Sequence, residues 1–433
     1  MSAVLDNMSI MNQQPAPLVG VPEWFNASRE AGWERFRELA MPSRKDEEWR
    51  FAPLRPLEFD NVALAPEGAP GKVEIAGGLE DRAARFVFVN DGLSYQQSEL
   101  PKGVICLPLE EALVLHGDLV RQYFMKGETR LGSAKFAALH RAHVSNGMFV
   151  HVPDGVQVEE PIEVFHRIEG ERMAVFPHTL VVTGKDAKVT VVDTFQSAAV
   201  SGTSWVIAVN DLVAGDGSSL NYVAIQDLNE VSRMIQVNET TVGANARARS
   251  FVLNVGAEWV RQESLSKLDG EGAHSDMLSV SIPARDQRYD QRTFQHHAKP
   301  HTYSDLLYKN TLYDSTRTIF SGLILVDEGA HYTDAYQTCR NLLMSDEADA
   351  TSMPGLEINA DQVKCSHGST SSPIHDDEIF YLCARGICPT TARQLLAHGF
   401  SVEVIERLEN EKLEELVMSF IDAKFAHIKG GGA

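Results

Sequence analysis

The chain has 433 residues, of which 43% are hydrophobic and 23% are charged, which suffices for two or three domains with substantial cores. Its formal net charge of −21 would repel phosphate backbones, so we expect no nucleic-acid partner. No apolar run has the length of a membrane span or the form of a signal peptide, and no two of the five cysteines have C-x-x-C spacing. We therefore expect a cytoplasmic protein with reduced thiols and no membrane contact.

The first 146 residues mix helical and strand patterns. Residues 1–18 are polar and include Pro15 and Pro17, so we expect them to be disordered. Residues 19–146 are expected to form an α/β, largely helical region, because apolar residues recur at helical spacing over 21–40, 109–125 and 134–142. No motif in this region indicates a catalytic or ligand-binding site.

From about Gly147 the apolar period changes to two, and similar tight turns recur at intervals of roughly 28 residues. Most contain glycine, and they end at Ala187, Ser218, Ala246, Ala273, Thr302 and Ala330. A repeat made only of strands and tight turns is typical of a solenoid, since propeller blades need four strands and leucine-rich repeats need L-x-x-L-x-L. The sequence therefore predicts a mainly β protein with a parallel β-helix core over 147–373, in preference to a β-sandwich with chance spacing.

Residues 374–433 are expected to form a C-terminal helical domain. Acidic residues suit the start of a helix over 376–384, and Pro389 suits the start of the next. An apolar stripe then runs from Val402 to Phe425 at helical spacing. Such a stripe is either internal core or the docking face for a partner, and the sequence favours neither.

Two soft metal-ligand side chains, Cys365 and His367, lie two residues apart where the β-rich region ends. On an extended chain both point to one face, where a thiolate and an imidazole can hold a thiophilic metal or the edge of an iron–sulfur cluster. Spacing alone favours a buried cysteine and a turn-capping histidine, because structural zinc takes four ligands. Cys339 lies about one coil earlier, so it either stacks next to Cys365 or faces the core while Cys365 faces outward.

Other candidate sites follow weaker patterns. Phosphate-binding loops and common hydrolase motifs do not occur in the sequence, so we expect no ATP bound by this chain. The histidines of FQHHAKPHTYSD fit a polar corner of one coil better than a metal site, because adjacent strand residues point to opposite faces. Asp286, Asp290 and Asp305 could serve acid–base catalysis in a β-helix polysaccharide lyase or hydrolase, but they follow no specific pattern.

Several stretches resemble the SufB/SufD family of paired iron–sulfur assembly scaffolds, and together they span nearly the whole chain. They are SRKDEEWR at 43–50, HHAKPHTYSDLLYKN at 296–310, FSGLILV at 320–326, QTCRNLLMSDEADATSMPGLEI at 337–358, KCSHGST at 364–370 and IFYLCARGI at 379–387. NLLMS and KCSHG look like the SufD branch of the family rather than the SufB branch.

The resemblance implies a right-handed parallel β-helix between an N-terminal helical region and a C-terminal helical domain that docks an ATPase. It implies a non-enzymatic scaffold subunit, in a cytoplasmic complex with a SufB-like paralogue and two copies of a SufC-like ABC ATPase. Closure of the ATPase pair would rearrange the subunit interface, where a transient iron–sulfur cluster or iron is held. His367 matches the family's interface histidine, with Cys365 beside it and Cys339 as a third candidate ligand.

Two departures from the family pattern leave alternatives open. Cys339 occupies the place of the SufB cysteine, and the segment GSTSSPIHDDE is more similar to SufB sequences. Both features suit a homodimeric scaffold that holds its own cluster. Gly368 replaces the SufB glutamate, which favours the SufD role. The polysaccharide lyase or hydrolase predicts a signal peptide and a carboxylate-lined groove. A purely structural solenoid adaptor accounts for the repeat and the tail but not for the paired soft ligands.

Overall fold

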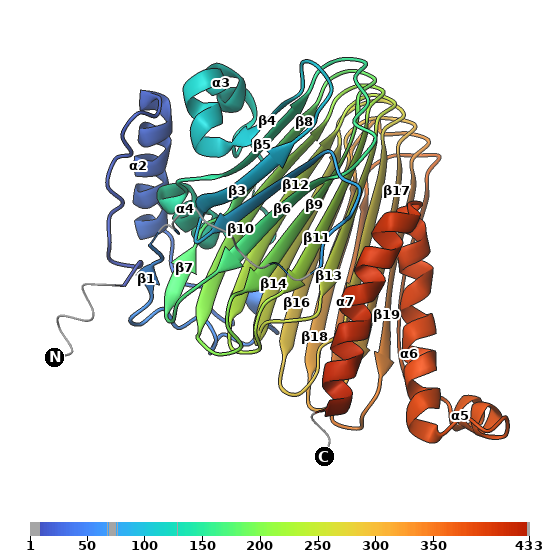
Figure 1. Ribbon diagram of the computed structural model, residues 1–433. Coiled ribbons are helices and arrows are strands. Elements are labelled where there is room, and N and C mark those ends of the chain that lie inside the picture. Colours follow the sequence, from blue (N-terminus) through green and yellow to red (C-terminus); the bar gives the residue numbers. More distant parts are fainter. Residues whose placement is uncertain (1–8, 67, 69–74, 76, 128, 431–433) are drawn as a thin grey trace.

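The computed structural model describes residues 9–66, 68, 75, 77–127 and 129–430. Two large, mostly parallel sheets face each other, and helices lie on their outer faces (Figure 1). Within the described ranges, no helix combines the length and the apolar character needed to cross a membrane.

Successive coils of the chain contribute one strand to each sheet, so the strands stack in chain order. Sheet A contains β1 (Ala63–Leu64), β4 (Ile105–Pro108), β5 (Gly147–Val152), β7 (Met173–Val175), β8 (His178–Thr183), β10 (Ser204–Ala214), β12 (Arg233–Val242), β14 (Trp259–Leu268), β16 (Arg288–His297), β18 (Arg317–Val326) and β20 (Asp349–Ile358). Sheet B contains β2 (Ala84–Val89), β3 (Gly92–Ser98), β6 (Ile162–Ile168), β9 (Lys188–Ser197), β11 (Ser219–Asp227), β13 (Arg247–Asn254), β15 (His274–Ser281), β17 (Tyr303–Leu312), β19 (Asp334–Leu343) and β21 (Lys364–Pro373). The predicted parallel β-helix is therefore confirmed, and its strands run from Gly147 to Pro373.

The recurring turns share one backbone feature. The third residue of every four-residue turn has a positive φ, and these residues are Asp186, Gly217, Asn245, Gly272, His301 and Gly329. Glycine, asparagine and aspartate tolerate this left-handed conformation better than other residues. The fourth residue is small and buried in each turn, so the turn reverses the chain and packs its end into the corner. The sequence repeat therefore marks the turns between strands of the two sheets, and glycine is one of several residues that occupy the positive-φ position.

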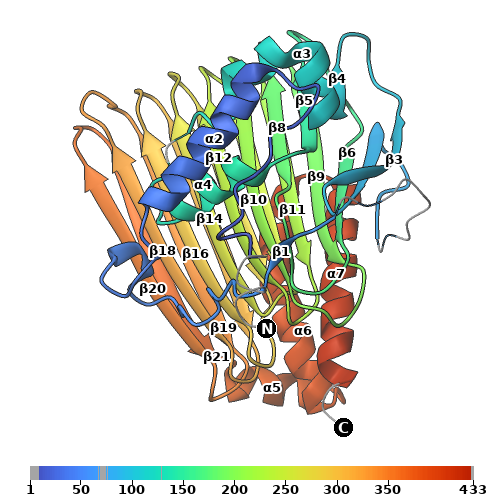
Figure 2. The same cartoon turned by 90° about the vertical axis from the view of Figure 1, so that its left-hand side faces the viewer.

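The outer face of sheet A is covered by the N-terminal region. The helices here are α2 (Glu23–Glu38), the 3₁₀ helix η1 (Glu47–Trp49), α3 (Leu109–Tyr123) and α4 (Ala134–His143). Figure 2 shows α2 and α4 lying across the strands of sheet A. Aromatic side chains of both layers form a shared core, in which Trp49 and Phe136 meet Trp205 and Trp259.

A buried arginine joins this N-terminal layer to the solenoid. Arg261 on β14 is fully buried, forms ion pairs with Glu263 and Asp290, and stacks on the Trp49 ring with its guanidinium carbon 3.9 Å from the ring centroid. It also donates a hydrogen bond to the backbone oxygen of Glu48 at 3.0 Å. The SRKDEEWR segment is therefore held to the strands by one buried cation.

The outer face of sheet B is covered by the C-terminal helices α6 (Pro389–Ile405) and α7 (Glu411–Gly430) and the 3₁₀ helix η2 (Glu406–Leu408) between them. They follow a shorter helix, α5 (Asp376–Cys383). Val404, Val417 and Ile421 from the apolar stripe share a core with Val223 and Leu253 of sheet B. Of the two roles open for this stripe, the structure therefore assigns it that of internal core.

The first residues differ in part from the expected disorder. Residues 1–8 lie outside the described part of the chain, but Ile10 is buried in the same core as Trp33 and Phe36. The Ser9 hydroxyl donates to the backbone oxygen of Phe59 at 2.9 Å. One apolar side chain that completes a core is enough to place this polar segment against the body of the protein.

A candidate metal-ligand site at the open end of the solenoid

The stack of coils stops at β20 and β21, which we call the open end. Each is the last strand of its sheet, and nearly all residues of β21 are exposed, whereas nearly all residues of β17 are buried. The Lys364 N–H donates to Thr333 O at 2.8 Å. Because N–H groups alternate in direction along a strand, those of Cys365, His367 and Ser369 point away from β19. The edge of β21 can therefore accept another strand.

Cys365 and His367 lie on the inward face of β21. In the parallel register, Cys365 lies beside Ala335 and His367 beside Gln337, and both of these β19 residues are buried. Cys365 is half-buried against a small cluster that includes Ile324 and Ala335, while His367 is exposed. The pair thus occupies core positions of the last coil in the part of the chain that the structure describes.

The electrostatic surroundings of Cys365 favour the thiol over the thiolate. Burial raises the pKa of the Cys365 thiol, and the nearby negative charge of Asp334 raises it further. Asp334 lies beside Lys364 in the register, and their charged groups are 3.8 Å apart. A metal that binds Cys365 must therefore displace a proton from the sulfur.

The structure separates Cys339 from Cys365, so the alternative in which these two thiols stack is wrong. Cys339 lies beside Ser369, four residues along β21 from Cys365, which corresponds to roughly 14 Å from strand geometry. The reason is that this coil is longer than the spacing of the two cysteines. Cys339 is fully buried with Met277 and Tyr308, and burial raises its pKa to about 12.

The open end offers two soft donors. Among the residues that the structure describes, no group of three or more His, Cys, Asp and Glu side chains is arranged to hold a metal ion. Iron–sulfur clusters are generally held by four protein ligands. Cys365 and His367 fit part of such a set, so a cluster or iron carried here as cargo would need further donors from another molecule.

Helix α5 follows β21 directly and forms an exposed tip. None of its residues is buried, and Phe380 and Tyr381 are 73% and 56% exposed. In Figure 1 the helix projects beyond the end of the two sheets. Large aromatic side chains left exposed on a projecting helix are typical of a contact with another protein.

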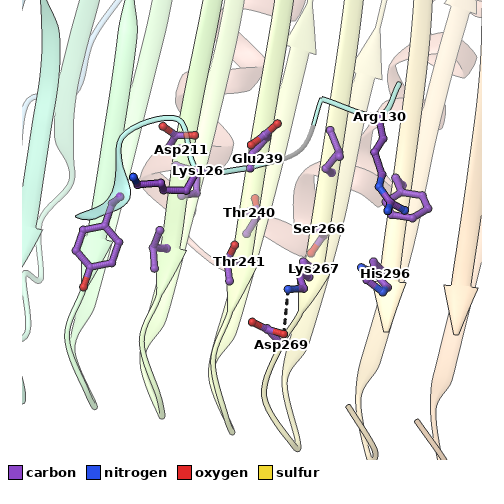
Figure 3. Close-up of a pocket in the computed structure, with 16 residues that line it drawn as sticks. Lys126, Arg130, Asp211, Glu239, Thr240, Thr241, Ser266, Lys267, Asp269 and His296 are labelled. Atoms are coloured by element: carbon purple, nitrogen blue, oxygen red, sulfur yellow. Dashed lines mark ion pairs between the residues drawn. The ribbon is translucent and has the colours of Figure 1, made fainter. Parts of the chain in front are cut away.

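A separate groove of about 330 Å³ lies on the outer face of sheet A, beneath the segment that follows α3 (Figure 3). Two of its charged groups pair within the groove, where Lys267 lies 3.1 Å from Asp269. His296 lies 2.8 Å from Asp327, which is outside the groove. His297 points to the opposite face and bonds Thr302 at 2.7 Å. These histidines belong to a polar corner, as their spacing predicts.

The carboxylates considered for glycan cleavage have structural partners. Asp290 is buried in its ion pair with Arg261, and Asp305 lies 2.5 Å from Arg407 on η2. Asp286 accepts a hydrogen bond from the Ser315 hydroxyl at 2.5 Å. Their positions favour structural roles over acid–base work.

The sequence pattern missed one residue of the site, Gln337. Its side chain is buried beside His367, and its amide donates to Gln295 Oε1 at 3.2 Å. The available signal was a polar residue at an inward position of QTCRN, where a solenoid interior would ordinarily place an apolar side chain.

Comparisons with known proteins agree with this architecture. Residues 166–400 match the family model "SUF system FeS cluster assembly, SufBD core domain", and residues 79–164 match "SufBD protein N-terminal region". The iron-sulfur cluster assembly protein SufD of Bacillus subtilis is 27% identical over 420 residues, which cover 93% of this chain and 94% of the relative. SufD of Escherichia coli is 28% identical over 399 residues, or 90% of each chain. SufB of Bacillus subtilis is 25% identical over 399 residues, or 92% of this chain and 84% of the relative.

Proposed function

The chain belongs to the SufBD family of iron–sulfur cluster assembly proteins, and we propose that it is a SufD-type scaffold subunit without catalytic activity of its own. It works in the cytoplasm, pairs with a SufB-like paralogue and binds a SufC-like ABC ATPase. Iron or a nascent cluster is held at the interface between the paired subunits.

The observation that carries this proposal is the open end of the solenoid. Two soft donors, Cys365 and His367, lie on core positions of an exposed last strand whose outward N–H groups have no strand to pair with in the described chain. A paralogue with a similar open end would add its strands there and bring the missing ligands. The same geometry also serves the alternative of a homodimer, which would bring two copies of the same pair together.

Helix α5 is the proposed dock for the ATPase. It offers the exposed Phe380 and Tyr381 next to the acidic residues Asp376 and Asp377. It is joined directly to β21, so a force applied to α5 acts close to the open end. Movement of the ATPase would in this way open and close the interface at Cys365 and His367.

Association with the partners tests the proposal. The chain is co-expressed with its SufB-like paralogue and the ATPase, and the complex is analysed by native mass spectrometry. We expect one copy of this chain, one paralogue and two ATPase subunits, and we expect Phe380→Asp to remove ATPase from this chain. Leu115→Asp, at a site 60% exposed on α3, is the matched control and should leave the complex intact. A chain that binds no ATPase would contradict the scaffold role, and a stable assembly without the paralogue would favour the homodimer.

A further inference from the structure

We propose that Gln337 is a positioning residue for His367: its carboxamide oxygen accepts the imidazole N–H when the other ring nitrogen binds a metal. The two residues are direct neighbours in the register of β19 and β21, and both lie on the inward face. No other polar side chain of β19 is paired with His367 in this register.

The carboxamide of Gln337 is fixed by its neighbours. Its Nε2 donates to Gln295 Oε1 at 3.2 Å, and Gln295 Nε2 in turn donates to Ser304 Oγ at 2.7 Å. Gly322 on the facing strand leaves the space for this group, because a Cβ there would lie 2.4 Å from Gln337 Nε2. The amide nitrogen is therefore committed to Gln295, which leaves Oε1 as the free end.

The free oxygen is an acceptor without a donor. Gln337 is only 1% exposed, yet its Oε1 has no hydrogen-bond partner among the described residues. Buried acceptors are rarely left unpaired, because the loss of water is then uncompensated. An unpaired oxygen on the strand neighbour of an exposed histidine offers the acceptor that a ligating histidine needs.

The chemistry of metal-bound histidine explains the match. When one ring nitrogen binds a metal, the other carries a proton, and in most sites that N–H donates to a protein oxygen that sets the ring orientation. Gln337, whose Oε1 has no donor among the described residues, is the register neighbour of His367. This inference rests on the proposed function in one respect only, namely that His367 acts as a ligand.

Zinc binding to the full chain tests the inference, with histidines labelled with ¹⁵N and His367→Asn used to assign the His367 signals. In the unchanged chain we expect Zn²⁺ to bind one ring nitrogen of His367 and the other nitrogen to carry a proton protected from exchange. Gln337→Met keeps the side-chain length but removes the acceptor, so we expect zinc affinity at His367 to fall by about tenfold. We also expect zinc no longer to prefer one ring nitrogen of His367 over the other. Gln337→Glu restores an acceptor and should restore both.

Thr338→Val is the matched control, because Thr338 lies next along β19 on the opposite face, beside Gly368. It should leave zinc affinity and the His367 signals unchanged. Equal affinity and the same nitrogen pattern in Gln337→Met and the unchanged chain would overturn the inference, as would zinc binding that does not involve His367. The proposed function can fail independently of this inference. If the zinc test succeeds but the chain forms no complex with an ATPase, the Gln337–His367 pairing stands and the scaffold role is contradicted.

Discussion

His367 lies beside Gln337 in the register of the last two strands of sheet B, yet His367 is exposed and Gln337 is buried. β21 covers β19, whereas no further strand of the described residues covers β21. The open end therefore presents to the outside a face that is core everywhere else in the solenoid. A partner that stacks on β21 would complete this core and enclose Cys365 and His367.

Two proline substitutions distinguish the free edge of β21 from its paired edge. Ser369→Pro removes an N–H that points away from β19, so we expect partner association to weaken at least tenfold, about 1.4 kcal/mol, with little change in melting temperature. Thr370→Pro removes an N–H that points toward β19, so it should lower the free energy of unfolding by about 1 kcal/mol or more. Equal melting temperatures for the two variants would contradict the assigned edge.

The charge of Asp334 controls the ionisation of Cys365. Because burial and then Asp334 raise the pKa of this thiol, Asp334→Asn should lower the pKa and increase the thiolate fraction at neutral pH. The rate of Cys365 alkylation by iodoacetamide, measured across pH, should shift its midpoint downward. Asp349→Asn on β20 serves as the control, and the same midpoint in both variants would rule out the effect of Asp334.

Arg261 is expected to be the most sensitive charged residue of the fold. Arg261→Ala leaves Glu263 buried without its cation and leaves Asp290 with Arg292 as its remaining cation, which should lower the free energy of unfolding by about 3–5 kcal/mol. Urea unfolding measures this loss, and hydrogen exchange should rise in the SRKDEEWR segment that Arg261 holds. Arg35→Ala breaks an exposed pair with Glu38 and should cost at most about 1 kcal/mol; similar losses in both variants would contradict the buried anchor.

Lys424 on α7 makes stability depend on alkaline pH. Burial lowers its pKa to about 8, so the folded state releases this proton before the unfolded chain does. The unfolded state then binds more protons between about pH 8 and 10.5, and the contribution of Lys424 to the free energy of unfolding rises with pH across that window.

Lys424→Met removes this contribution. Between pH 7 and pH 10 the unfolding free energy of the unchanged chain should rise relative to that of Lys424→Met, by on the order of 3 kcal/mol at most. Urea unfolding at both pH values provides the measurement. Parallel stability curves for the two proteins would show that Lys424 titrates normally.

Local rules account for most of the fold. The six turns are recognisable because each needs a left-handed third residue and a small buried fourth residue. The relative placement of Cys339 and Cys365 was not predictable, because it depends on the lengths of the loops after Leu343 and Ile358 rather than on strand periodicity. The stripe from Val402 to Phe425 was ambiguous for a similar reason: only the packed structure shows that sheet B covers it.

The most direct test is the cluster content of the assembled complex. The chain is co-purified without oxygen with its paralogue and the ATPase, and iron, acid-labile sulfide and the visible spectrum are measured. The variants are Cys365→Ala/His367→Ala and, as the control, Cys388→Ala, which changes an exposed cysteine outside β21. We predict an intact complex in both cases, with cluster content lost in the double variant and kept in Cys388→Ala. Full cluster content in the double variant would contradict the assignment of the open end as the cluster-holding site.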